Sequence, residues 1–181
     1  MTGTNASFGG LTGAFDLDTS GVTTLTTFNA NVSIASINSG ITNIATTLVA
    51  TTGNQTYGVT TLSGGTVTLT GGAIVFNGTV DGTSTVTPTA LTTTGATSTT
   101  FNGQVGQTAP GTLASITSGV TTFGALVTNV STVAQQTYGD TTLTAASIAF
   151  TGTTVTFGGS LNGAAAGVTA WTVSEVKPIM T

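Results

Sequence analysis

Short alternations of apolar residues and threonine recur along the chain, as in TVTLT (66–70) and TTVTF (153–157). A period of two is typical of β-strands, because successive side chains of a strand point to opposite faces. Thr, Val and Ile branch at Cβ and fit the pleated surface of a sheet. Asn-Gly and Asp-Gly pairs interrupt the runs and favour tight turns with positive φ. The pattern therefore predicts an all-β chain of short strands and sharp corners.

Four segments occur twice in the same order, which indicates an internal repeat. The copies are separated by 81, 79, 73 and 81 residues: QTYGVTTL (55–62) and QTYGDTTL (136–143), SIASINSGIT (33–42) and TLASITSGVT (112–121), TTFNANV (26–32) and TTFNGQV (99–105), TGGAIVFNGTVDG (70–82) and TGTTVTFGGSLNG (151–163). We predict a single domain made of two units of about 75 to 80 residues, at 26–98 and 99–170. A partial unit precedes them at 1–25, and a tail without a counterpart follows at 171–181.

Aromatic residues recur about every 20 positions between short strands, which is typical of a solenoid. We predict a parallel β-helix in which the two QTYG segments hold equivalent positions of separate coils. Outward threonines would then stack on threonines of the next coil, and a narrow interior would accept Val, Ile, Leu, Ala and single Phe rings. Asn-Gly between alternating runs is also a strong hairpin signal, so an antiparallel β-sandwich is the alternative architecture.

The composition narrows the possible functions. The 181 residues include 48 Thr and 26 Gly, and only 3% are charged, against roughly 25% in ordinary domains. A single lysine cannot form the basic surface that nucleic acid or an anionic membrane requires. No apolar run approaches the length of a membrane helix, and the opening MTGTNASFGG lacks the basic stretch and apolar core of a secretory signal. The abundance of β-branched residues favours an ordered chain over a disordered one.

The inventory of reactive side chains predicts neither a catalytic site nor a cofactor. The chain contains no His, Cys or Arg to act as base, nucleophile or oxyanion donor. Asp16 and Asp18 are the only close carboxylates and share one face of a predicted strand. Calcium needs six to eight oxygen ligands, and the GGxGxDx motif of calcium-binding β-rolls is absent. We interpret the pair as solvated and predict no metal site.

Two further patterns concern the surface. Five Asn-X-Ser/Thr sequences match the acceptor pattern for glycosylation, which we attribute to the abundance of Ser and Thr: Asn5, Asn31, Asn54, Asn77 and Asn129. Rows of threonine at strand spacing suggest an alternative function, the binding of ice or of a carbohydrate. An ice-binding plane should repeat its Thr pair in every coil, whereas the pairs here recur irregularly.

The order of these motifs resembles the β-strand repeat of large bacterial secreted adhesins of the filamentous-haemagglutinin type. The resemblance extends from Phe8 to about Val173 and is carried by TTFNGQV, LASITSGVTTF, QTYGDTTL and TGTTVTFGGSLNGA. It implies a right-handed parallel β-helix, export to the cell surface, and a stalk or adhesive role with surface glycans or a host receptor as partners. The chain contains neither a secretion domain nor a carboxy-terminal anchor of that family.

The repeat also leads to a prediction of self-association. FGGLTG (8–13) resembles FGGSLNG (157–163) at the end of the second unit, so the chain resembles a slice of a longer array. A coil at one end would then find on a second copy the neighbour that it has inside the rod. We predict head-to-tail stacking into an open fibre, since such a contact is heterologous. The expected contacts are Phe8, Leu11, Phe157, Leu161 and Trp171.

Overall fold

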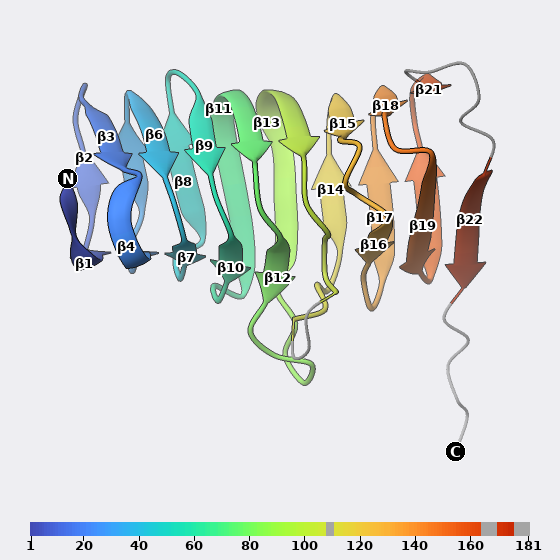
Figure 1. Ribbon diagram of the computed structural model, residues 1–181, viewed down its shortest axis with the longest axis horizontal. Coiled ribbons are helices and arrows are strands. Elements are labelled where there is room, and N and C mark those ends of the chain that lie inside the picture. Colours follow the sequence, from blue (N-terminus) through green and yellow to red (C-terminus); the bar gives the residue numbers. More distant parts are fainter. Residues whose placement is uncertain (108–110, 164–169, 176–181) are drawn as a thin grey trace.

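The computed structural model describes residues 1–107, 111–163 and 170–175, which form an elongated stack of β-strands (Figure 1). The chain winds through three parallel stacks, and each coil contributes one strand to each stack. Every strand pair in the described part of the chain is parallel. The predicted β-helix is therefore confirmed, and the antiparallel sandwich is excluded for these residues.

The strands are assigned to the stacks by their pairing. Stack 1 contains β1 (Thr2–Phe8), β4 (Gly21–Phe28), β7 (Thr42–Ile44), β10 (Thr60–Leu62), β12 (Val80–Gly82), β16 (Asn129–Ser131), β19 (Ser147–Gly152) and β22 (Ala170–Glu175). Stack 2 contains β2 (Leu11–Thr12), β5 (Val32–Ile34), β8 (Leu48–Thr51), β14 (Ile116–Ser118), β17 (Gln135–Tyr138) and β20 (Thr154–Phe157). Stack 3 contains β3 (Asp16–Thr19), β6 (Ser36–Ser39), β9 (Gln55–Tyr57), β15 (Thr121–Phe123), β18 (Thr141–Leu143) and β21 (Leu161–Gly163).

Two long strands and one bridging residue complete the coils. β11 (Thr66–Phe76) and β13 (Ala90–Phe101) each begin in stack 2 and end in stack 3. Val105 forms single bridges to Val80 and Val130, which join β12 to β16 within stack 1. With these additions, stacks 2 and 3 each hold eight strand positions, and stack 1 holds nine.

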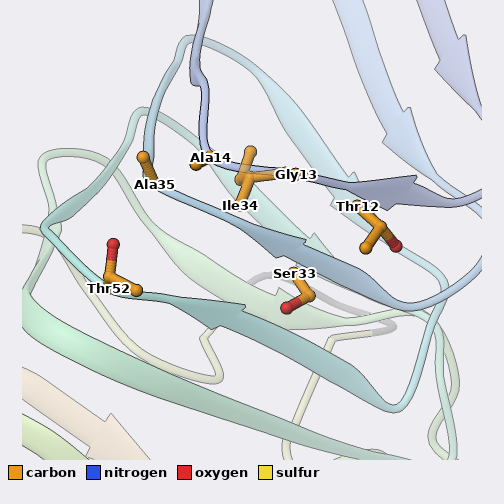
Figure 2. Close-up of a pocket in the computed structure, with 7 residues that line it drawn as sticks. All are labelled: Thr12, Gly13, Ala14, Ser33, Ile34, Ala35 and Thr52. Atoms are coloured by element: carbon orange, nitrogen blue, oxygen red, sulfur yellow. The ribbon is translucent and has the colours of Figure 1, made fainter.

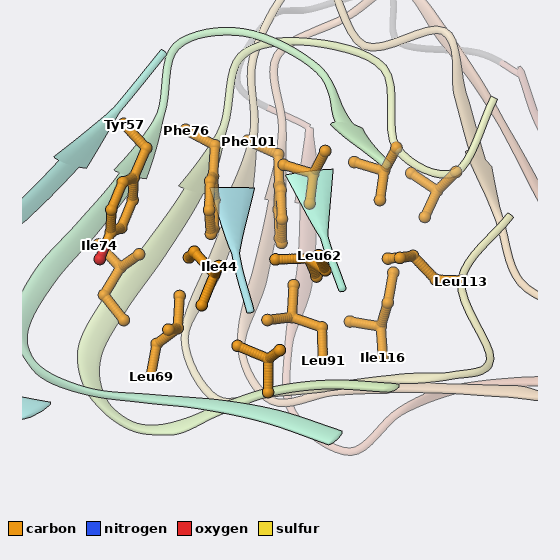
Figure 3. Close-up of a cluster of buried hydrophobic side chains, with 14 of the residues drawn as sticks. Ile44, Tyr57, Leu62, Leu69, Ile74, Phe76, Leu91, Phe101, Leu113 and Ile116 are labelled. Atoms are coloured by element: carbon orange, nitrogen blue, oxygen red, sulfur yellow. The ribbon is translucent and has the colours of Figure 1, made fainter. Parts of the chain in front are cut away.

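The core is a narrow column of inward side chains, because short strands alternate buried and outward positions. Aliphatic residues of successive coils lie above one another beside a file of aromatic rings (Figure 3). Rings of Tyr57, Phe76, Phe101 and Phe123 stack with centroid separations of 5.6, 5.2 and 5.5 Å. All four belong to stack 3, so the core contains a continuous aromatic ladder along this stack.

The two QTYG segments lie in separate coils, as predicted, but not in the same stack. Gln55–Tyr57 form β9 in stack 3, whereas Gln136 and Tyr138 lie in β17 in stack 2. From β9 to β17 the chain takes eleven strand positions, counting β11 and β13 twice and Val105 once. Each coil contains three strand positions, so eleven positions are three full coils and two further strands. The second segment therefore lies in a different stack from the first. The prediction of equivalent positions is therefore wrong by one stack.

The other repeated segments show the same displacement. β6 in stack 3 corresponds to β14 in stack 2, and Phe28 in stack 1 corresponds to Phe101 in stack 3. The residue separations differ, but the number of strand positions is eleven in each case, because loops absorb the extra residues. β22 continues the series, since Ala170-Trp171-Thr172 holds the place of Ala90-Leu91-Thr92. β22 covers residues 171–175 of the predicted tail, and residues 176–181 lie outside the described part of the chain.

Candidate functional site: a threonine ladder and two open coil ends

An outward file of threonine runs along stack 2. Strand register places one threonine of each of five successive coils next to the threonine of the following coil: Thr68, Thr92, Thr117, Thr137 and Thr156. Neighbouring strands of a sheet lie about 4.8 Å apart, so the threonines of adjacent coils lie next to one another. The predicted stacking of outward threonines is confirmed at these positions.

This outward file, called the threonine ladder below, contains one threonine in each coil. β11 and β20 carry further outward threonines two residues away, at Thr66 and Thr154, but the strands paired with them place Ala90 and Gln135 at those positions. A second, shorter file lies on stack 3 and contains Thr100, Thr122 and Thr142. The irregular Thr pairs inferred from the sequence are therefore irregular in space as well.

Both ends of the rod carry half-buried apolar residues that extend the core. Phe8 and Leu11 lie in the first coil, and Phe157 and Leu161 lie in the last coil. All four pack against the buried cluster while remaining partly exposed. Trp171 lies in β22, paired in register with Ile148. The predicted assembly contacts therefore divide between the two ends of the rod.

The strands at these ends have a partner on one side only, among the described residues. β1, β2 and β3 pair with β4, β5 and β6, while β20, β21 and β22 pair with β17, β18 and β19. Among the described strands, the outer edge of each end strand therefore has no strand paired with it. Such edges are templates for pairing with another chain.

A shallow depression of about 330 Å³ lies beside the first coils, at the bend between stacks 2 and 3 (Figure 2). Its lining is small and uncharged: Thr12, Gly13, Ala14, Ser33, Ile34, Ala35 and Thr52. Phe15, which is 42% exposed, has its ring beside Gly13. The hydroxyls of this lining suit hydrogen bonds to a neutral ligand. Sequence reasoning missed the depression because its residues come from three coils.

The acidic residues are held by hydroxyl and amide neighbours. Asp18 and Asp16 project from one side of β3, as predicted. The Oδ1 atom of Asp18 accepts hydrogen bonds from the hydroxyl and backbone N–H of Ser20, at 2.6 and 2.9 Å, and these bonds lower the pKa of the carboxyl group. The Asp16 carboxylate accepts a bond from the Ser36 hydroxyl. Within the described ranges no three acidic, His or Cys side chains converge on a point where a metal could bind.

The Asn residues of the five acceptor sequences occupy the surface. Asn5, Asn31, Asn54 and Asn77 are exposed, and Asn129 is half-buried. Three of their Oδ1 atoms accept structural hydrogen bonds: those of Asn31 from Thr46, Asn54 from the backbone of Ala73, and Asn77 from Asn102. These amides therefore stabilise the corners between coils.

Two buried Gln–Tyr pairs are the most elaborate polar contacts in the core. The Nε2 atom of Gln55 donates to Thr70 O at 2.8 Å, and the Tyr57 hydroxyl donates to Gln55 Oε1 at 2.8 Å. Gln136 and Tyr138 repeat both bonds with Thr151 O, at 2.8 and 2.9 Å. Burial raises the pKa of both tyrosines well above the ordinary value. Because these groups satisfy one another, they are structural.

Comparison with family models, with curated proteins and with solved structures finds no significant match to this chain. In the part of the chain that the structure describes, no helix is long and apolar enough to cross a membrane. The class of protein rests on the architecture itself. The chain is a β-solenoid repeat protein.

Proposed function

We propose that the chain is an extracellular structural or adhesive segment whose copies associate end to end into a surface fibre. The observation that carries the proposal is the pair of coil ends, where half-buried apolar residues pack against the core and where the strands pair with another described strand on one side only. A second copy would extend each stack by backbone pairing and cover the exposed ends of the core. The resemblance of the repeats to secreted adhesins supports a surface location and a non-enzymatic role.

The small number of charges favours association. A chain with five acidic residues and one lysine has little electrostatic repulsion to keep its copies apart. Backbone hydrogen bonds and apolar contacts would supply the attraction, and neither is strongly screened by salt. We therefore expect fibres that persist over a wide range of ionic strength.

Electron microscopy of the 181-residue chain at increasing concentration tests the proposal, with sedimentation velocity as a quantitative measure. We expect filaments that lengthen with concentration. Leu11→Lys should shorten or abolish them, because a charge at the end of the core would be buried without a partner. Thr122→Lys is the matched control, since it places the same charge on an outward position in the middle of the rod. Discrete particles at every concentration and salt level would contradict the proposal.

The threonine ladder favours a second candidate, binding of ice or of a neutral carbohydrate. Five hydroxyls in register form an ordered file on one face, and the depression near Phe15 adds three more hydroxyl-bearing residues. Thermal hysteresis and a glycan array measure these activities directly. Loss of a signal in Thr137→Lys, with Thr122→Lys unchanged, would assign it to the ladder.

A further inference from the structure

We propose that Asn77 is a site of spontaneous deamidation, which the fold activates at Asn77 and suppresses at the equivalent residue of the next coil, Asn102. This modification is independent of end-to-end association. Both asparagines lie in the tripeptide Phe-Asn-Gly. Strand register pairs the preceding residues, Phe76 and Phe101, so the two asparagines occupy the same corner of adjacent coils. The chain thus contains a matched pair of sites.

Deamidation of an Asn-Gly pair needs no reactant other than water. The backbone nitrogen of Gly78, after losing its proton, attacks Cγ of Asn77. A bond forms between these two atoms, the bond from Cγ to Nδ2 breaks, and Nδ2 takes up a proton from solvent and leaves as ammonia. Water then opens the cyclic succinimide at the Cγ carbonyl to give aspartate, or at the main-chain carbonyl to give isoaspartate. Glycine favours the attack because it has no Cβ to obstruct the approach.

A hydrogen bond between the two amides activates Asn77. The Nδ2 atom of Asn102 donates to Asn77 Oδ1 at 3.1 Å. Negative charge develops on this oxygen when the backbone nitrogen of Gly78 attacks, so the donor stabilises the tetrahedral intermediate. Among the described residues, the Nδ2 atom of Asn77 has no hydrogen-bond partner that would hinder its departure, and the side chain is exposed to water.

The same hydrogen bond protects Asn102. Its Nδ2 atom, which would have to leave, is the donor to Asn77. Its Oδ1 atom lies so close to Gly124 of the following coil that a Cβ at Gly124 would overlap with it. Asn102 is therefore half-buried between the corners of two coils, both of which the structure describes. Rotation of its side chain toward the nitrogen of Gly103 would break the bond to Asn77, so we expect slow deamidation here.

Conversion of Asn77 to aspartate would add a charge to a rod that has few. The number of acidic residues would rise from five to six. The new carboxylate would still accept the hydrogen bond from Asn102, which becomes stronger when its acceptor is ionised. The aspartate form should therefore remain folded and carry the additional charge at a corner in the middle of the rod.

Peptide mapping by mass spectrometry tests the proposal on the full chain, incubated at a mildly alkaline pH below the range in which its tyrosines ionise. Chymotrypsin cuts after Phe76, Phe101 and Phe123 and so places Asn77 and Asn102 in different peptides. In the folded chain we expect Asn77 to deamidate at least about fivefold faster than Asn102, since only Asn77 has a donor at its Oδ1 atom. In urea the two rates should become equal, because both sites have the same flanking residues.

The variant Asn102→Asp tests the role of the donor, because it keeps the size of the side chain and removes the N–H group. Deamidation of Asn77 should slow by about threefold or more in this variant, with the fold checked by circular dichroism. An unchanged rate would overturn the activation of Asn77 by Asn102. Equal rates at Asn77 and Asn102 in the folded chain, faster conversion of Asn102, or a difference that persists in urea would overturn the proposal that the fold selects the site.

Discussion

The Gln55–Tyr57 and Gln136–Tyr138 segments form the same bonds on different stacks of the solenoid. In each, the glutamine Nε2 donates to a threonine hydroxyl four residues back and to two carbonyl oxygens of the same unit. All these partners lie within fifteen residues of the glutamine in the sequence. The local sequence therefore determines these hydrogen bonds. The same bonds form whether the segment lies in stack 3 or in stack 2.

The aromatic packing around the two tyrosines differs, because it depends on the stack in which each tyrosine lies. Tyr57 lies in the ladder of stack 3 and stacks on Phe76 at an interplanar angle of 21°. Tyr138 stacks on Phe157 but meets Phe123 edge-to-face at 87°. Corresponding strands of the two units are eleven strand positions apart, and eleven is not a multiple of three. Each aromatic ring of the second unit therefore lies in a different stack from its counterpart in the first unit. Identical local segments thus acquire different long-range neighbours.

The largest expected effect comes from removing either buried glutamine. Gln55→Leu would leave Thr70 O and the Tyr57 hydroxyl without their partners inside the core. Each unsatisfied buried group costs about 1 to 3 kcal/mol, so the free energy of unfolding should fall by about 3 to 5 kcal/mol. Gln136→Leu should cost the same within about 1 kcal/mol, since its bonds are the same. Urea unfolding followed by circular dichroism measures both.

Gln135→Leu provides the control, because Gln135 precedes Gln136 in β17 and is exposed. A surface substitution of this kind should change the free energy of unfolding by less than about 0.5 kcal/mol. Losses that differ strongly between Gln55→Leu and Gln136→Leu would show that the stack, and not the local network, determines the stability of the segment.

The sequence predicted the parts of the structure that depend on local pattern. Alternation and Asn-Gly corners led to the β-helix, and the repeated QTYG segments indicated equal local structures. The stack assignment could not be predicted, because it depends on how many strand positions a unit contains. β11 and β13 pass from one stack to the next without an interruption, and Val105 counts as a position although it forms only single bridges. The alternation of apolar and polar residues does not reveal how many strand positions these segments occupy.

The glycine after each tyrosine gives the next largest effect. A Cβ added at Gly58 would lie 2.8 Å from Gly40 O, and one added at Gly139 would lie 3.0 Å from Gly119 O. Both carbonyls belong to the backbone of the preceding coil, so alanine would force the coils apart. We expect Gly58→Ala to cost about 1 to 3 kcal/mol, comparable with overpacking of a core, and Gly139→Ala to cost somewhat less.

Gly65→Ala is the control, since a Cβ added at Gly65 would have no heavy atom within 4 Å. It should be neutral or slightly stabilising, because alanine reduces the entropy of the unfolded chain. Melting temperatures of the three variants compare the two corners directly. A loss at Gly65→Ala equal to that at Gly58→Ala would mean that coil spacing is not the cause.

Alkaline titration offers a smaller and more specific comparison. Tyr57 and Tyr138 are the only tyrosines, and burial raises the pKa of both. The unfolded chain ionises its tyrosines near pH 10, so the folded state loses stability as the pH rises above about 10 and is unaffected below it. Tyrosinate absorbance should therefore appear together with unfolding. Tyr57→Phe or Tyr138→Phe should reduce this pH dependence by about half and cost about 1 to 2 kcal/mol at neutral pH.

The smallest expected effect concerns the one residue that differs between QTYGVTTL and QTYGDTTL. The Oδ1 atom of Asp140 accepts hydrogen bonds from the backbone N–H and the hydroxyl of Ser160, at 2.8 and 2.9 Å. These bonds lower the pKa of the Asp140 carboxyl group. The stabilisation is therefore present above the unfolded pKa of about 4 and is lost as the pH falls through the folded pKa. Asp140→Asn should remove this acid dependence.

Val59 occupies the equivalent place in the first unit and is 45% exposed. Thr60 donates its backbone N–H to Thr79 O, as Thr141 does to Ser160 O, so Thr79 corresponds to Ser160. Val59→Asp should therefore transfer the acid dependence to the first unit, with the backbone N–H and hydroxyl of Thr79 as donors. Urea midpoints at about pH 3 and pH 6, on either side of the unfolded carboxyl pKa, would compare the two variants with the unmodified chain. An unchanged pH dependence in Val59→Asp would mean that the corner in stack 3 differs from its counterpart in stack 2 in more than this side chain.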